Sequence, residues 1–384
     1  MGRKSSKNPK PARPPAASPP EVALGRGRLW TFRIVAMTVP LLFFVLLELA
    51  LRAGGFGYES RFVVRDTIGG RPVVRDNPDF TQRFFPPPLF RSPHPFTLPR
   101  TKPPGTYRIF VLGESAAMGD PAPAFGFGRI LEVLLRDRYP EHRFEVVNAA
   151  VTAINSHAVR DIARDVADLE PDLILIYMGN NEVVGPYGAG TVFSPGRQSL
   201  AAIRAQLSLK TFRVGQLADR LARAGSAAKL PRRWEGMEMF LGHEVRATDA
   251  GLTSVYDHFR ANLEDVVGTA QHAGAKVLLC TIGTNLKDSA PFASQHRPDL
   301  APADETRWRS HVTAGAEHET AGRWGERSTP TPAPKRSMPS MRSWPFGRAA
   351  VAMHCSDTRT PPATSRGPAT STRCVSARTP RSTV

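Results

Sequence analysis

The sequence predicts an α/β fold in which helices cover both faces of a parallel β-sheet. Four short apolar runs have the composition of strands, and amphipathic helical patterns separate them. The run DLILIYMG, residues 172–179, is almost continuously apolar, as expected for a strand that is covered on both faces. In such sheets the ligand site lies at the carboxyl ends of the strands, so polar residues that follow the strands are candidate site residues.

Most of the positive charge lies at the two ends of the chain. The formal net charge of the 384 residues is +17. The first 33 residues carry +7 and residues 327–384 carry +9, which leaves +1 for everything between them. Because the middle of the chain is nearly neutral, we expect no nucleic-acid partner.

The N-terminus predicts a membrane anchor. Residues 1–28 are rich in Lys, Pro and Ser and are predicted to be disordered. Residues 34–51 contain a single charge, Glu48, and are near the lower length limit for crossing a bilayer. A cleaved signal peptide combines the same features, but this run is long for that role and no clear cleavage site follows it. We therefore predict a signal anchor over residues 29–52.

The basic N-terminus also predicts the orientation of this anchor. By the positive-inside rule, the first residues stay in the cytoplasm and the remainder of the chain is exported to the periplasmic side of the inner membrane. Residues 53–104 follow as a proline-rich juxtamembrane segment. Its stretch FFPPPLFRSPHPFTLPRTKPPG is too dense in proline for regular structure, so we predict an extended arm.

Alternating strands and helices begin at Tyr107. The predicted strands cover residues 107–112, 144–150, 172–179 and 276–283. Apolar residues at helical spacing predict helices around residues 127–135, 159–166, 200–221 and 255–270, the last of them ended by Gly274.

Three of the predicted strand ends carry residues suited to acyl transfer. The first is followed by Gly113, Glu114 and Ser115, the second by NAAVTAINSH (residues 148–157), and the third by GNNE (residues 179–182). Acyl transfer needs a hydroxyl that attacks and N–H donors where the oxyanion develops. The simpler interpretations are that Ser115 only caps a helix and that Asn181 only shapes a turn.

These three blocks resemble the motifs of the SGNH (GDSL-type) hydrolases, which are serine esterases. The family's G-D-S turn is similar to residues 113–115, with Glu in place of Asp. Its N-x-x-x-x-G segment resembles residues 148–153, and its G-x-N-D segment resembles residues 179–182. The match covers roughly residues 105–288 and implies a flavodoxin-like, three-layer α/β/α fold for a domain over residues 105–312.

The resemblance also implies the roles of individual residues. It makes Ser115 the nucleophile and the donor of one oxyanion N–H, and it makes Asn181 the side-chain donor. Ala153 stands where the family has a glycine, and its N–H can serve only if the turn does not need a positive φ. No metal or organic cofactor is implied, since the three cysteines lack metal-ligand spacing: Cys280, expected in the core, Cys355 and Cys374.

The catalytic base of the family is missing from its expected place. These hydrolases take it from a late D-x-x-H, in which Asp orients His. None of the histidines after Glu182 has Asp or Glu three residues before it. We expect Glu182 to be a structural carboxylate, and we expect His157 to lie on the exposed start of a helix rather than to act as the base.

The C-terminal part suggests why the base is missing. AGAEHETAGRW, residues 314–324, resembles the first helix of a tetratricopeptide repeat, which places the start of such a region at residues 313–326. Residues 327–384 lose all apolar periodicity and are predicted to be disordered. This tail could bind acidic polymers or lipid headgroups, but we favour an out-of-frame translation that deletes the repeats and the D-x-x-H segment.

The sequence thus predicts a membrane-anchored SGNH-like esterase that is impaired by the lack of its base. Its substrate would be an ester or an acylated glycan. One alternative is a non-catalytic, membrane-tethered scaffold or binding module with a vestigial serine site, whose tetratricopeptide-like region binds a protein partner. Another is an O-acyltransferase that acts on a cell-envelope glycan.

Overall fold

The structure is a computed structural model that describes residues 26–194, 197–225, 233–283, 296 and 299–322. The chain divides into two units, Met1–Pro298 and Asp299–Val384. In the second unit the structure describes one helix, α8 (Pro302–Thr320), which has no buried residue. The predicted disordered tail, residues 327–384, lies outside the described residues, and the tetratricopeptide interpretation stays a prediction.

The first unit is built around a four-stranded parallel sheet, which confirms the predicted fold class. Its strands are β4 (Thr106–Gly113), β5 (Arg143–Asn148), β6 (Leu173–Tyr177) and β7 (Lys276–Leu279). They lie in the order β5-β4-β6-β7, and every neighbouring pair is parallel. The first strand of this sheet therefore lies between the second and the third, which is the flavodoxin-like order.

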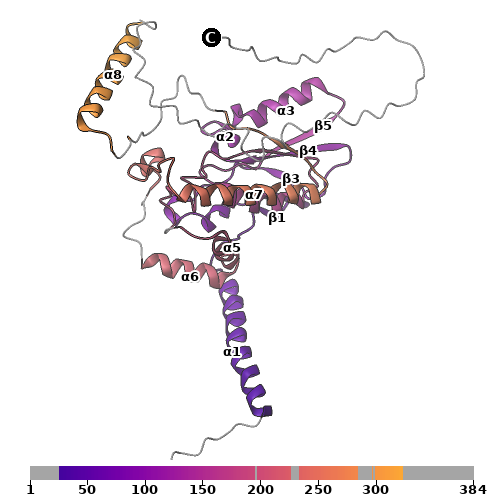
Figure 1. Ribbon diagram of the computed structural model, residues 1–384. Helices are drawn as coiled ribbons and strands as arrows, with labels where there is room; N and C mark the ends of the chain where they lie inside the picture. The colour runs from indigo at the N-terminus through magenta and orange to yellow at the C-terminus, as the bar shows by residue number, and fades with distance from the viewer. Residues whose placement is uncertain (1–25, 195–196, 226–232, 284–295, 297–298, 323–384) are drawn as a thin grey trace, which may run out of the picture. The chain divides into compact units, whose positions relative to one another are not determined.

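Helices cover both faces of this sheet. They are α3 (Phe127–Arg138), α4 (Ser156–Ala167) and α7 (Gly251–His272). The connection through α3 runs along the sheet in the opposite direction to those through α4 and α7, so right-handed crossovers place α3 on one face and the other two on the other. Figure 1 shows α3 and α7 on opposite sides of the sheet, and α4 packs against α7. The result is three layers with β4 and β6 buried at the centre.

The N-terminal helix α1 (Arg26–Ala53) has the composition expected of a membrane span. Its segment Trp30–Ala53 is long and apolar enough to cross a membrane, although a signal sequence can have the same length and composition. The helix starts at Arg26, so the last three residues of the segment predicted to be disordered are helical. Residues 1–25 lie outside the described part of the chain.

The prediction that the proline-rich stretch, residues 84–105, has no regular structure is wrong, because a short 3-10 helix and a strand form within it. Residues 53–104 form an antiparallel sheet of β1 (Val63–Ile68), β2 (Arg71–Asp76) and β3 (Thr97–Pro99), in the order β1-β2-β3. The third strand lies inside the proline-rich stretch. It is short and at the edge of the sheet, where proline is tolerated because no partner needs its missing N–H.

Aromatic side chains between the prolines give this segment a core of its own. The short 3-10 helices η1 (Phe80–Arg83) and η2 (Pro87–Leu89) carry part of it. The buried apolar residues of this core are Phe62, Val74, Phe80, Phe84, Phe85, Leu89 and Leu98. The density of proline was therefore a misleading guide to this segment. Its large apolar residues are the stronger signal for a packed segment.

Two further elements differ from the predictions. The single helix expected over residues 200–221 is two helices, α5 (Leu200–Leu209) and α6 (Arg213–Ala224). The break follows Lys210, whose buried ammonium group pairs with Asp219 and so turns the chain. Strand β7 ends four residues earlier than expected and leaves Leu278 and Leu279 exposed, so this strand is less covered than its composition indicated.

Candidate active site

The strand order places a crevice where β4 and β6 leave the sheet side by side. In doubly wound sheets the ligand site lies at this switch point, outside the carboxyl ends of the strands. Ser115 is the first residue of the short helix α2 (Ser115–Met118), directly after β4. The turn before it requires glycine, because Gly113 has φ +156° and a Cβ there would lie 2.0 Å from the carbonyl oxygen of Tyr177. This tight turn holds half-buried Ser115 at the edge of the sheet.

Glu114 joins the ends of the two central strands. Its side chain is fully buried, and its two oxygens accept backbone N–H groups from Gly179 (3.1 Å) and Asn181 (3.0 Å). Burial raises the pKa of Glu114 to about 8, and the nearby carboxylate of Glu182 adds to the rise, while the N–H donors oppose it. The Glu that stands where the family motif has Asp is therefore a bridge beneath the residue predicted to be the nucleophile.

The second strand end is fastened to the other two. Val151 N donates to the carbonyl of Gly113 at 3.2 Å, and Asn148 Nδ2 donates to the carbonyl of Met118 at 2.9 Å. Asn181 Nδ2 donates to the carbonyl of Ile154 at 3.0 Å, which uses one of the two hydrogens on that nitrogen. The structure thus brings together the three loops that carry Ser115, Ala153 and Asn181.

The predicted role of Ala153 assumes a turn without positive φ, but the residue has a positive φ. Its φ is +67°, in the left-handed region, and the residue is buried. A Cβ in this region costs roughly 1–2 kcal/mol, which a glycine avoids. The condition set from the sequence, a turn without positive φ, is therefore not met. The alanine nevertheless adopts the glycine-like conformation at this cost and keeps its N–H in the turn, so this N–H stays a candidate donor.

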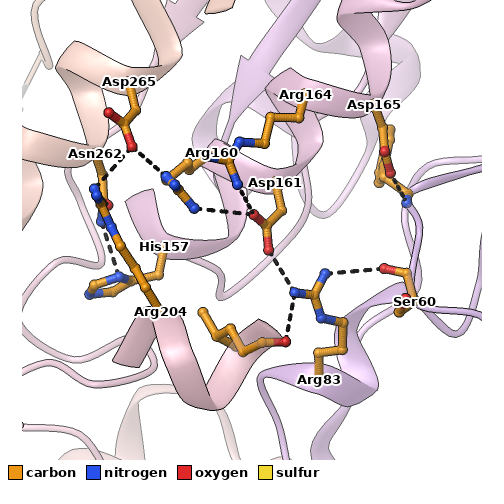
Figure 2. Close-up of polar contacts among 12 residues, drawn as sticks. Ser60, Arg83, His157, Arg160, Asp161, Arg164, Asp165, Arg204, Asn262 and Asp265 are labelled. Carbon is orange, nitrogen blue, oxygen red and sulfur yellow. Dashed lines mark hydrogen bonds and ion pairs between the residues drawn. The ribbon is translucent and has the colours of Figure 1, made fainter. Parts of the chain in front are cut away.

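The expectation that His157 is exposed is wrong. It lies in the first turn of α4, but only 4% of its surface is accessible. Its Nδ1 lies 3.0 Å from Asn262 Nδ2 of α7 (Figure 2). Its ring packs against those of Tyr187 and His258. Burial lowers the pKa of His157 to about 3, and neighbouring positive charges add to this. The packing of α7 over this turn, which no local pattern reveals, buries the ring.

Glu182 and Asn262 hold the start of α4 from two sides. Glu182 accepts hydrogen bonds from Ser156 N (2.7 Å) and Ser156 Oγ (2.8 Å), and burial raises its pKa to about 7. Asn262 Nδ2 lies 3.1 Å from the same Ser156 Oγ as well as beside His157. The sequence offered no motif that would single out Asn262, because its partners lie more than a hundred residues earlier in the chain.

Charged side chains extend this network away from the crevice (Figure 2). Arg160 and Arg204 both contact Asp265, at 2.5 and 3.0 Å. The next residue of α4, Asp161, lies 3.6 Å from Arg160 and pairs at 2.9 Å with Arg83, which is buried and lies in η1. Helix α4 is therefore fixed to α5, α7 and residues 53–104, and this rigid support holds the loop before it.

A cavity of about 680 Å³ lies between α2 and the ends of β6 and β7; Ala116 of α2 lines it, whereas the preceding Ser115 does not. Cys280 lines this cavity and is half-buried, and burial raises the pKa of its thiol. It packs against a cluster of buried apolar residues: Val111, Ala117, Ala150 and Leu175. Among the residues that the structure describes, no three His, Cys, Asp or Glu side chains gather as metal ligands. The walls are mostly apolar: Ala116, Gly119, Asp120, Pro121, Ala122, Phe125, Gly126, Phe127, Tyr177 and Cys280.

Comparisons with known proteins find similar folds among solved structures. The protein TesA is 17% identical, with a TM-score of 0.25 over 55% of this chain and 74% of that one. AlinE4, described as an SGNH-hydrolase family esterase, is 15% identical, with a TM-score of 0.24 over 57% of this chain and 98% of that one. No protein-family profile and no curated protein matches the sequence.

Proposed function

We propose that this chain is a membrane-anchored serine esterase of the SGNH type. In this proposal Ser115 is the nucleophile, and the backbone N–H groups of Ser115 and Ala153 and the free Nδ2 hydrogen of Asn181 stabilise the oxyanion. The observation that carries the proposal is the bridge through Glu114, which binds the N–H groups of Gly179 and Asn181 and so fixes the third loop next to the serine turn. A structural helix cap would not need three strand ends joined at one point.

The proposed reaction has two steps. Ser115 Oγ attacks the carbonyl carbon of the ester, the bond to the alcohol oxygen breaks, and the alcohol leaves with a proton while the acyl group stays on the serine. Water then attacks the acyl-serine, which releases the acid and restores the hydroxyl. In both steps the negative charge develops on the carbonyl oxygen, where prepositioned N–H donors stabilise it.

Proton transfer is the weak point of this site. The sequence has no D-x-x-H. His157, the other histidine considered as a base, is buried; its Nδ1 lies beside Asn262 Nδ2, and its pKa is about 3. We therefore propose an impaired enzyme in which solvent accepts the serine proton. In well-studied serine proteases, removal of a triad member leaves a rate of about 10³–10⁴ over water, supplied by binding and the oxyanion hole.

Hydrolysis of p-nitrophenyl acetate by the purified full-length chain tests this function. We expect turnover slightly above background that Ser115→Ala abolishes, because the attacking hydroxyl is gone. Ser199→Ala is the matched control: Ser199 caps α5 through its hydroxyl, and its loss should leave turnover unchanged. Equal rates for the native chain and Ser115→Ala would favour the binding module with a vestigial site. Ordinary enzymatic turnover would show that another base operates.

A further inference from the structure

Helix α6 turns its polar side toward the protein. Gln216 is buried, its Nε2 donates to the carbonyls of Tyr58 (3.0 Å) and Lys210 (3.1 Å), and its Oε1 accepts the N–H of Tyr58 (3.0 Å). Three residues later, Asp219 pairs with buried Lys210 at 2.9 Å and with Arg223 at 2.7 Å. Gln216 and Asp219 thus find their partners within the described part of the chain, whereas the buried Nε of Arg213 has none there.

The apolar side of the same helix faces outward. Leu221 is 65% exposed, and the small residues Ala218 and Ala222 beside it are exposed as well. Leu209 and Phe212, which precede the helix, are 62% and 54% exposed. A surface helix in water normally presents the reverse arrangement, with its apolar stripe on the core. An exposed apolar stripe of this kind marks a surface that another apolar phase covers.

The start of α6 is fixed at the last turns of α1. Val214 N donates to Glu48 Oε2 at 2.9 Å, and Glu48 also pairs with Arg52 at 2.7 Å. Arg52 lies at the end of the apolar span, where a helix that crosses a bilayer reaches the headgroups. In Figure 1, α6 crosses this end of α1, so it lies along the membrane surface if α1 crosses the membrane.

A groove of about 740 Å³ runs between the two helices and α5. Phe44, Val45 and Leu49 of α1 form one wall, so the groove opens onto the surface that α1 would present to lipid. Gln206 lines it too, and its buried Oε1 accepts no hydrogen bond among the described residues. The opposite wall carries the charged pair Lys210 and Asp219 as well as the apolar and small residues Leu209, Phe212, Val214, Gly215, Ala218 and Ala222.

We propose that this groove binds the acyl chain of a membrane phospholipid, with α6 lying in the headgroup region. The occupant is lipid rather than protein because the apolar stripe of α6 is continuous, through the groove, with the apolar surface of α1. Interfacial helices bind membranes through buried apolar area in this way. The proposal rests on α1 being a membrane anchor, but it is independent of the esterase chemistry.

Photo-crosslinking in vesicles tests the proposal. The full-length chain is reconstituted in phosphatidylcholine that contains a small share of phosphatidylcholine with a diazirine in its acyl chain, and labelled residues are mapped by mass spectrometry. We expect labels on both α1 and residues 209–222. Ala222→Trp fills the groove and should reduce the label on α5 and α6 by about tenfold, the cost of expelling about two methylene groups from contact. Ala224→Trp, on the same helix but outside the groove, should not.

Each other outcome overturns the proposal in a recognisable way. Labels on α1 alone would show that the chain is anchored but that α6 lies away from lipid. Crosslinks between α6 and a second copy of the chain would show that protein covers the stripe. An unlabelled chain would remove the anchor and the lipid site together, while esterase turnover, measured separately, would still report on Ser115. An equal reduction by both tryptophan variants would show that the effect comes from the helix surface and not from the groove.

Discussion

At the scale of single residues, the site contains one residue with a strained backbone and one carboxyl group whose pKa is raised above its ordinary value. Ala153 has the left-handed backbone of a glycine, and Glu114 is a carboxyl group in a fully buried position. Both residues stand where the family motif has a different residue. Substituting each of them therefore measures how the residue that differs from the motif affects the stability of this chain.

Replacing Ala153 with glycine should stabilise the fold. The change removes a Cβ from a residue with φ +67° and should raise the free energy of unfolding by about 1 kcal/mol. Urea unfolding of the purified chain measures it. Ala163→Gly is the opposite control: Ala163 is buried in the interior of α4, where glycine should cost about 1 kcal/mol. If Ala153→Gly and Ala163→Gly lowered the free energy of unfolding by similar amounts, Ala153 would be unstrained.

The buried carboxyl groups should make stability fall as pH rises. Burial raises the pKa of Glu114 to about 8 and of Glu182 to about 7, so between their unfolded values near 4.5 and these pH values the folded chain binds more protons than the unfolded one. The free energy of unfolding should therefore decrease from about pH 5 to about pH 8. His157, with a pKa near 3, acts in the opposite direction only below about pH 6.5.

Glu114→Gln isolates this contribution. The variant cannot titrate, so its free energy of unfolding should vary less with pH between about 6.5 and 8 than that of the native chain. Glu141→Gln, at an exposed position, should leave the slope unchanged. A native slope of zero in this window, or an unchanged slope in Glu114→Gln, would show that Glu114 is ionised throughout.

At the scale of elements, local patterns predicted what local interactions form. The first sheet strand was expected over residues 107–112 and forms over Thr106–Gly113, because a run of large apolar residues defines it. Features that depend on contacts between distant parts of the chain were not predicted. Strand β3 needs β2, more than twenty residues earlier, and the burial of His157 needs α7, about a hundred residues later. The loops of the site were predicted because strand ends share one edge, whereas the left-handed turn at Ala153 depends on the loop as a whole.

The contact between α4 and α7 should depend on Asn262. Its Nδ2 lies 3.1 Å from Ser156 Oγ and 3.0 Å from His157 Nδ1 in a fully buried position. Asn262→Ala removes both contacts and deprives His157 Nδ1 of this partner, while Ser156 Oγ keeps its hydrogen bond to Glu182. We expect a loss of about 1–3 kcal/mol in the free energy of unfolding. Gln271→Ala, exposed on the same helix, should change it by less than about 0.5 kcal/mol. If Asn262→Ala and Gln271→Ala changed the free energy of unfolding by the same amount, the contacts of Asn262 would not contribute to the structural support of the site.

At the scale of the whole molecule, the structure joins the candidate anchor to the α/β unit directly. Glu48 of α1 accepts the N–H of Val214, and Gln216 of the same helix α6 is bonded to Tyr58, just beyond α1. The antiparallel segment is in turn held by Arg83 against α4. Residues 53–104 are therefore part of the folded unit rather than a flexible arm.

If α1 crosses the membrane as proposed, the α/β unit lies on one side of it, and the charges predict which side. Five basic residues occur among the first thirteen: Arg3, Lys4, Lys7, Lys10 and Arg13. By the positive-inside rule they remain in the cytoplasm, so alkaline phosphatase fused after Gly283 should be active, since it folds only outside the cytoplasm. Replacing the five with glutamine should lower this activity. The same replacement at five exposed basic residues far from the span should not: Arg100, Arg136, Arg138, Arg143 and Lys276. Green fluorescent protein fused after Gly283 should stay dark in the native chain. Bright fluorescence there, together with an inactive phosphatase, would place the site in the cytoplasm and reverse the proposed topology.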